Sequence, residues 1–138
     1  MKYTDGKNIM VYAQSADGAP VGAALETVSK AAELAKANGE EVIAVVFGKD
    51  TDTKTVITAG ASKVLVAGEE GLQAEEKAQI LVKLAEKYQP KAVYMAGTPE
   101  GKMIAPAVSA AFESGCVTDV TGITADGVYT SLSYNGNV

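Results

Sequence analysis

The fold is decided by the stretch Glu41–Gly48, which has the sequence EVIAVVFG. All residues from Val42 to Phe47 are apolar, and most of them are β-branched. An uninterrupted run of this length is typical of a strand buried on both faces, as the central strands of a parallel sheet are. The stretch therefore predicts a parallel sheet with helices packed on both sides.

Similar apolar runs recur along the chain and alternate with longer stretches rich in Ala, Leu, Lys and Glu. Such alternation is typical of strand–helix units that wind around one sheet. The further strands are expected at Asn8–Ala13, Lys63–Ala67, Lys91–Ala96, Val117–Thr124 and Val128–Tyr134. Asp126-Gly127 separates the last two and is a hairpin signal. We expect an α/β, doubly wound three-layer sandwich with a mainly parallel five-stranded sheet and a C-terminal hairpin.

Helices are expected between these strands because apolar residues recur there at helical spacing, as Ala78, Leu81 and Ala85 do. Pro20 suits the first turn of a helix. Pro106 lacks a backbone donor, so it kinks its helix or marks the true start. The helices are expected at Pro20–Gly39, Asp50–Gly60, Ala74–Tyr88 and Lys102–Ser114.

The composition excludes several kinds of function. The chain has 138 residues, enough for one domain with its own core, and its net charge of −5 disfavours a nucleic-acid partner. It has no histidine and only one cysteine, so we expect no metal site and no histidine-based catalytic triad. The lone Cys116 cannot form an internal disulfide, and no apolar run is long enough to span a membrane. These features predict a cytoplasmic protein without catalytic residues.

The most promising loop for a ligand is Gly97–Lys102, which has the sequence GTPEGK. It follows an expected strand, and ligands of open α/β sheets bind beyond the carboxyl ends of the strands. Glycines permit close approach of the backbone to a phosphate, and a lysine supplies positive charge. Gly97, Thr98, Gly101 and Lys102 are therefore the candidate cofactor-binding residues.

A tight turn between a strand and a helix is the simpler interpretation of the same loop. The two glycines stand one residue too close for a phosphate loop, and Met103 occupies the position where Ser or Thr would bind magnesium. The carboxylate of Glu100 would also repel a phosphate.

The other polar residues have structural interpretations. Ser, Asp and Gly in Gln14–Gly18 fit a turn, and Asp50 and Asp52 fit helix caps. Cys116 has no basic neighbour in sequence, which favours a buried thiol over a nucleophile. Asp119 lies in an apolar strand segment, either at the rim of the sheet or beside a partner.

Four stretches carry a family resemblance when they are taken in order. They are Ala59–Val66 (AGASKVLV), Ala96–Pro106 (AGTPEGKMIAP), Gly115–Gly122 (GCVTDVTG) and Tyr134–Asn137 (YNGN). Over essentially its whole length, the chain resembles the N-terminal domain of electron-transfer flavoprotein alpha subunits, a family that includes FixB-type proteins. The resemblance implies the strand order 3-2-1-4-5, a role in electron transfer with FAD, and a beta-subunit-like partner.

The chain also departs from the family pattern. Lys102 and Ser131 stand where the family has arginine, which weakens contacts made through guanidinium groups. The family's flavin lies chiefly in a second, C-terminal domain, and no residue here matches that domain. The resemblance thus implies that residues 1–138 are a single domain without the FAD-binding domain, and that this chain alone does not bind FAD.

Two alternatives come from other functional classes. The expected architecture is similar to that of adenine-nucleotide hydrolases and universal stress proteins, so the chain could be a dimeric binder of AMP or ATP, with Gly97–Lys102 near the phosphates. It could also be a structural homodimer without a ligand, paired through the edge of the C-terminal hairpin.

Overall fold

The structure is a computed structural model that describes residues 8–16, 18–49, 51–68, 71–90, 92–96, 98–111, 117–123 and 129–131. In the described part of the chain, no helix combines the length and the apolar character that crossing a bilayer requires.

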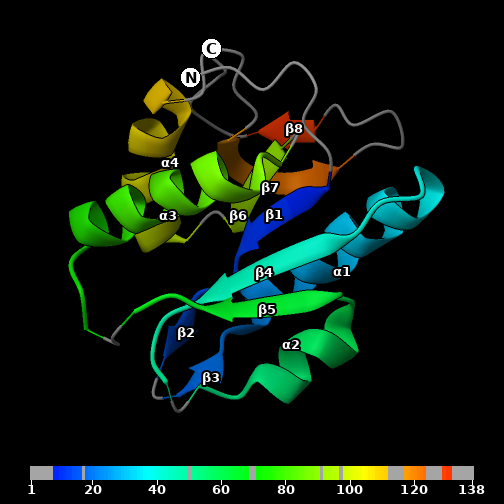
Figure 1. Cartoon of the computed structure of the whole chain (residues 1–138), viewed down its shortest axis with the longest axis horizontal. Helices are drawn as coiled ribbons and strands as arrows, with labels where there is room; N and C mark the ends of the chain where they lie inside the picture. Colours follow the sequence, from blue (N-terminus) through cyan, green and yellow to red (C-terminus); the bar gives the residue numbers. More distant parts are fainter. Residues whose placement is uncertain are drawn as a thin grey trace.

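The main sheet has six strands in the order β5-β4-β1-β6-β7-β8 (Figure 1). The first five pair in parallel, and β7 and β8 pair antiparallel. Counted along the chain, the parallel strands have the order 3-2-1-4-5, so that expectation is confirmed. The strands are β1 (Ile9–Tyr12), β4 (Val42–Val46), β5 (Lys63–Val66), β6 (Ala92–Ala96), β7 (Val117–Ile123) and β8 (Tyr129–Ser131).

Helices cover both faces of this sheet, which confirms the doubly wound, three-layer architecture. Alternate residues of each strand point to opposite faces, so Val11 and Val42 pack under α1 and α2, whereas Met10 and Val45 pack under α3 and α4. The fully buried Leu81 of α3 lies in this second layer. The helices are α1 (Gly22–Ala37), α2 (Thr53–Ala59), α3 (Ala74–Tyr88) and α4 (Pro99–Ala111).

The segment before α1 differs from the prediction. Pro20 does not lie in the first turn of the helix but in β3 (Ala19–Pro20), which pairs antiparallel with β2 (Ser15–Ala16). Val21 then stays extended, and its N–H donates to the carbonyl of Gln14 at 3.0 Å. This small hairpin holds the chain extended, so the helix begins only at Gly22.

The start of α4 also differs from the prediction. The helix begins at Pro99, before the expected Lys102, and it continues on both sides of Pro106. Pro99 occupies the first helical position, where a missing N–H costs nothing because that group has no partner within the helix. Pro106 therefore does not mark the start of this helix.

Candidate functional site

The strand order reverses between β1 and β6. From β1 the chain builds outward through β4 and β5, then crosses to β6 and β7 on the other side. In open α/β sheets, ligands bind at such a switch point, beyond the carboxyl ends of the two strands. Here those ends are Tyr12 of β1 and Ala96 of β6, and Tyr12 is in register with Met95, the residue before Ala96.

One side-chain bridge joins the segments that follow these two strands. The hydroxyl of Thr98, after β6, donates to Gln14 Oε1, after β1, at 2.5 Å. The same hydroxyl oxygen accepts from the N–H of Gly101 at 3.0 Å. Thr98 directly precedes Pro99, so it is the N-cap of α4, and its capping hydroxyl is anchored to the other strand's loop.

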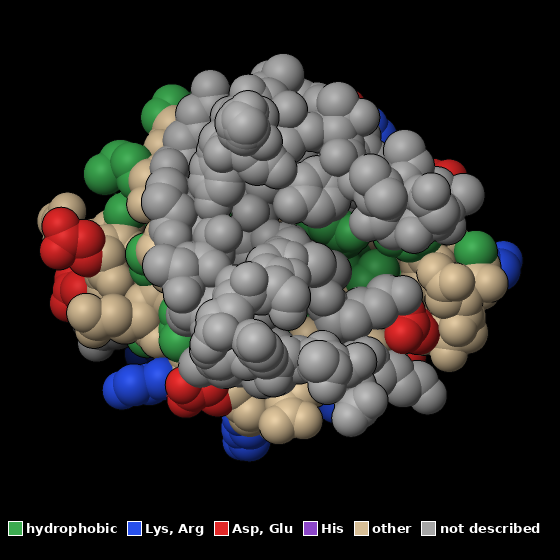
Figure 2. Space-filling model, turned by 90° about the horizontal axis from the view of Figure 1, so that it is seen from above, with side chains coloured by type: hydrophobic (Ala, Val, Ile, Leu, Met, Phe, Trp, Pro, Cys, Tyr) green, Lys and Arg blue, Asp and Glu red, His purple; other side chains and the backbone are tan. Residues whose placement is uncertain are grey.

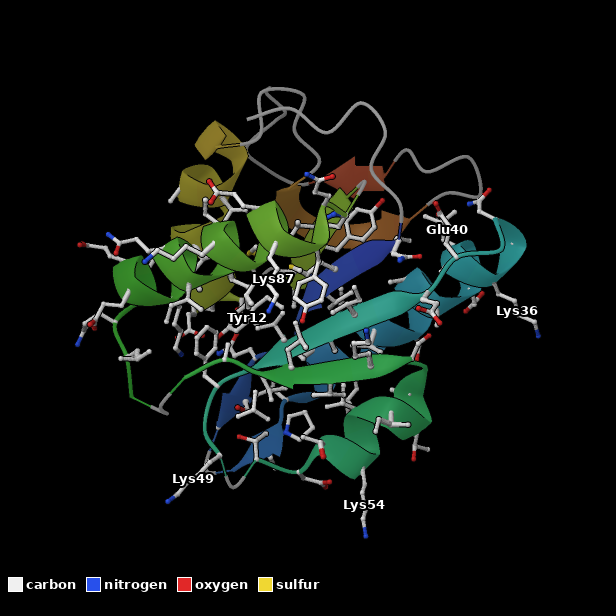
Figure 3. All side chains as sticks on the ribbon, in the orientation of Figure 1. Tyr12, Lys36, Glu40, Lys49, Lys54 and Lys87 are labelled. Carbon is white, nitrogen blue, oxygen red and sulfur yellow. The ribbon has the colours of Figure 1, made fainter. Side chains whose placement is uncertain are left out.

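A second bridge consists of three ionisable side chains from different elements. The Tyr12 hydroxyl donates to one carboxylate oxygen of Glu100, in the first turn of α4. Lys77 of α3 donates to the other carboxylate oxygen at 2.8 Å and to the Tyr12 hydroxyl oxygen at 3.3 Å. Figure 3 shows Tyr12 beside α3. We call Tyr12, Lys77 and Glu100 the switch-point triad.

The triad contains one buried positive charge, the ammonium of Lys77, which its partners compensate. The side chain of Lys77 is 9% exposed and that of Glu100 is 26% exposed. The Lys77 ammonium also lies 5.5 Å from the ring centre of Phe47 and 5.9 Å from that of Tyr12. An ammonium is retained in such surroundings only when an anion and hydrogen-bond acceptors compensate for its lost hydration, as Glu100 and the two rings do here.

The phenol of Tyr12 does not ionise near neutral pH. Burial raises the pKa of Tyr12 above its ordinary value, and the hydrogen bond to Glu100 and the charge of that carboxylate raise it further. The phenol therefore stays protonated and acts as a hydrogen-bond donor.

The close packing of α4 against the end of β6 requires a glycine at Gly101. A Cβ atom there would lie 2.1 Å from the carbonyl oxygen of Ala96, far inside van der Waals contact. The first turn of α4 can approach the end of β6 this closely only without a side chain at Gly101. The tight-turn interpretation thus explains this glycine without a ligand.

The predicted cofactor-binding residues are brought together only in part. Thr98 and Gly101 share a hydrogen bond at the start of α4. Gly97 and the side chain of Lys102 lie outside what the structure describes. Whether these four residues bind a cofactor stays a prediction.

Of the other candidates, Asp52 caps α2 as expected, because its carboxylate accepts from the N–H of Thr55 at 3.2 Å. Asp119 lies in β7 opposite Met95, which places it one strand away from the switch point. Asp50, Cys116 and the Asp126-Gly127 turn lie outside the described residues. Within the described residues, no group of His, Cys, Asp or Glu side chains is placed to hold a metal ion.

Sequence reasoning missed Tyr12 and Lys77, and it considered the Glu100 carboxylate only as a group that would repel a phosphate. The structure also pairs this carboxylate with Lys77. A signal for Lys77 was present, since it stands four residues before the buried Leu81 and therefore shares its helix face.

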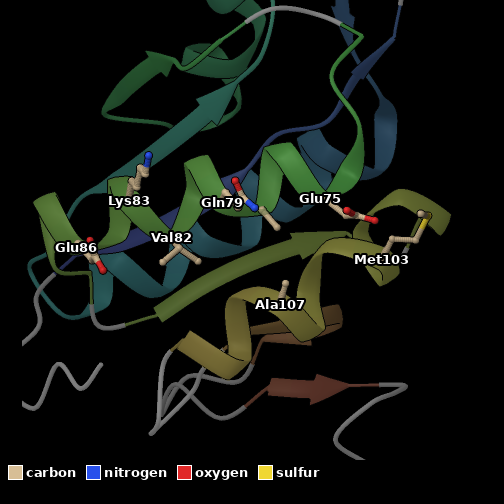
Figure 4. A pocket seen from close by; sticks show the side chains of 8 residues that line it. Glu75, Gln79, Val82, Lys83, Glu86, Met103 and Ala107 are labelled. Carbon is tan, nitrogen blue, oxygen red and sulfur yellow. The ribbon is translucent and has the colours of Figure 1, made fainter.

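A surface pocket of about 540 Å³ lies between α3 and α4 (Figure 4). Val82 and the exposed Met103 contribute apolar surface, and Glu75, Lys83 and Glu86 contribute charges of both signs. Acidic and basic side chains also occur together around the margin of the face in Figure 2.

Comparison with known proteins agrees with this architecture. The sequence model of a family described as the electron transfer flavoprotein domain matches residues 9–138. The electron transfer flavoprotein subunit alpha of Clostridium acetobutylicum is 29% identical over 131 residues, which are 91% of this chain and 39% of that protein. The corresponding subunit of Thermoanaerobacterium thermosaccharolyticum is 29% identical over 127 residues, 88% of this chain and 38% of that protein. Protein FixB of Clostridium saccharobutylicum is 25% identical over 147 residues, covering 100% of this chain and 44% of that protein.

Among solved structures, a universal stress protein in complex with cAMP aligns with a TM-score of 0.48 and 15% identity, over 84% of this chain and 98% of that one. The chain spans about two fifths of the length of the alpha-subunit relatives. The family model, in contrast, covers nearly the whole chain. The family that it describes, the electron transfer flavoprotein domain, is also the one that the name of the Clostridium acetobutylicum relative indicates. The chain therefore belongs to the electron transfer flavoprotein domain family, and the relatives named above are alpha subunits and FixB.

Proposed function

We propose that this chain is the scaffold module of an electron carrier of the alpha-subunit type. In this proposal it binds a beta-subunit-like partner and positions a flavin that is held outside residues 1–138. The support is the family match together with the coverage of the relatives, since the chain corresponds to 39% of an alpha subunit. The redox chemistry would be supplied by the flavin, and the protein would supply its orientation and surroundings.

The proposal that the flavin is held outside this chain rests on the switch point, which the chain's own side chains occupy. The triad and the Gln14–Thr98 bridge both join the β1 side to the β6 side, where a doubly wound domain would hold a dinucleotide. The Glu100 carboxylate would also face the phosphates of FAD, which are anionic. The described residues at this place therefore do not fit the cofactor, and we place the flavin elsewhere in the assembly.

The experiment is a domain replacement. The matching N-terminal region of the Clostridium acetobutylicum alpha subunit is exchanged for this chain, and the chimera is expressed together with the partner subunit. We expect the chimera to assemble and to show visible flavin absorbance, while the chain purified alone is colourless. A folded chimera that neither assembles nor holds flavin would contradict the proposal.

The chain purified alone serves as the control for the alternative hypothesis that it binds an adenine nucleotide. After denaturation, the supernatant is examined by mass spectrometry. A stoichiometric amount of AMP or ATP would favour nucleotide binding over the proposed scaffold role.

A further inference from the structure

Lys77 is a buried cation whose charge is balanced by a more exposed carboxylate. Its ammonium lies 5.5 Å from the ring centre of Phe47 and 5.9 Å from that of Tyr12, and it contacts Glu100 Oε2 at 2.8 Å. The Glu100 side chain is the more exposed of the two, at 26% against 9% for Lys77. Solvent therefore reaches the carboxylate more than it reaches the ammonium.

The Lys77–Glu100 pair lies at a position of the fold where related architectures bind ligands. Tyr12 ends β1, and Glu100 lies in the first turn of the helix after β6, so the carboxylate lies at the switch point of the sheet. Ligands of doubly wound domains bind there, commonly through a phosphate group. An ammonium and a phenolic O–H that converge on one anionic group are the donors that a phosphate needs. In this chain both donors are directed at the chain's own carboxylate.

We propose that the Glu100 carboxylate is a built-in counter-ion that takes the place of an anionic ligand and closes the switch point to phosphorylated molecules. Removing the carboxylate opens a small anion site, in which Lys77 and the Tyr12 hydroxyl bind a phosphate group. The inference concerns one charge pair and does not depend on the role of the chain in electron transfer.

Shape and charge both support this assignment. Glu100→Ala removes the whole carboxylate and leaves the Lys77 ammonium in its apolar surroundings, where it needs a new anion. Inorganic phosphate is an anion with several acceptor oxygens, so it can bind both donors at once. Glu100→Gln is the matched control, because an amide of the same size still fills the position while the charge is removed.

The test uses thermal unfolding of the full chain in sodium phosphate and in sodium chloride at the same ionic strength. For Glu100→Ala we expect the melting temperature to rise by about 4 °C at a phosphate concentration about ten times its Kd. The phosphate response is counted as the rise beyond that of the wild type, because phosphate as a kosmotropic anion stabilises proteins in general. Glu100→Gln should show no such additional rise. The double variant Lys77→Met/Glu100→Ala should lose the response, because the cation that binds the anion is gone.

Two outcomes would overturn the proposal. One is a phosphate response of Glu100→Ala no larger than that of the wild type, and the other is a response that persists in the double variant. If Glu100→Ala is unfolded in chloride, the readout becomes the circular dichroism signal on adding phosphate, which should restore the fold of this variant. AMP is tested in parallel to distinguish a nucleotide phosphate from the free ion: a response to either that requires Lys77 supports the proposal, and one that survives Lys77→Met contradicts it.

Discussion

The close approach of α4 to the end of β6 leads to a quantitative prediction for Gly101→Ala. The new Cβ would lie 2.1 Å from the Ala96 carbonyl oxygen, whereas ordinary contacts begin at 3.4 Å. The obstacle is backbone on the strand side, so no side chain can move aside to relieve it. The first turn of α4 must shift by more than 1 Å, on the order of the difference between these distances.

Such a shift disturbs both bridges at the switch point. Forcing extra atoms into a packed region costs about 1–3 kcal/mol. The Gly101 N–H also donates to the Thr98 hydroxyl, and loss of an N-cap costs about 1 kcal/mol. We therefore expect the free energy of unfolding to fall by about 3 kcal/mol, which for a domain of this size lowers the melting temperature by about 10 °C.

The measurement is urea unfolding followed by circular dichroism, with Gly22→Ala as the matched control. Gly22 opens α1 and has no atom within 4 Å of its would-be Cβ, so this variant should be neutral or more stable by up to about 1 kcal/mol. Equal stability of the two variants would contradict the expected clash, because both replace a glycine in the first turn of a helix and differ chiefly in the contact with Ala96.

Three further predictions concern the core, the triad and a helix cap. Leu81→Ala should lower the free energy of unfolding by about 2–5 kcal/mol in urea titrations, because this fully buried side chain leaves a cavity; a loss below 1 kcal/mol would place Leu81 outside the core. The wild type should lose stability as the pH rises above the ordinary tyrosine pKa of 10.0, since unfolded tyrosine ionises there while the raised pKa keeps folded Tyr12 protonated; Tyr12→Phe should weaken this dependence, and an unchanged slope would contradict the assigned environment. Asp52→Ala should lower the melting temperature, whereas Asp52→Asn, which can still cap, should preserve it near neutral pH. Hydrogen bonds from Thr55 lower the pKa of Asp52, so its contribution is present above the ordinary value of 3.8 and lost as the pH falls through the lower folded value; a destabilisation by Asp52→Ala that stays constant through this range would contradict it.

The layers of the fold could be predicted from the sequence because each carries its own periodic pattern. The unbroken apolar run at Val42–Val46 is buried at every position, as a central parallel strand requires. The bounds expected for the helix Ala74–Tyr88 match the structure. The order of the strands came from the family resemblance instead, since an apolar pattern does not indicate which strands are neighbours.

Local signals failed where tertiary contacts decided the structure. Pro20 fits the first turn of a helix, yet it pairs with Ser15 in a hairpin whose strands are too short to show an alternating pattern. Pro99 and Pro106 could each open a helix, and the capping hydroxyl of Thr98 selects Pro99.

The triad shows the limit of sequence reasoning at the candidate site. Tyr12 stands 65 residues from Lys77 and 88 residues from Glu100 along the chain. No spacing rule connects residues so far apart, and only the crossing of the chain from one side of the sheet to the other brings them together. The glycine-rich turn could be predicted because its residues are consecutive. Its partners Tyr12 and Lys77 could not be predicted, because they are distant in the sequence.

If the chain's own side chains fill the switch point of this domain, the cofactor must be carried elsewhere and the chain alone should bind neither FAD nor AMP. Isothermal titration calorimetry of the purified wild-type chain with FAD, and separately with AMP, measures this binding. We expect no binding heat for either molecule at any concentration up to the millimolar range. Stoichiometric binding with a micromolar Kd that is altered by substitutions at Tyr12 or Thr98 would contradict it.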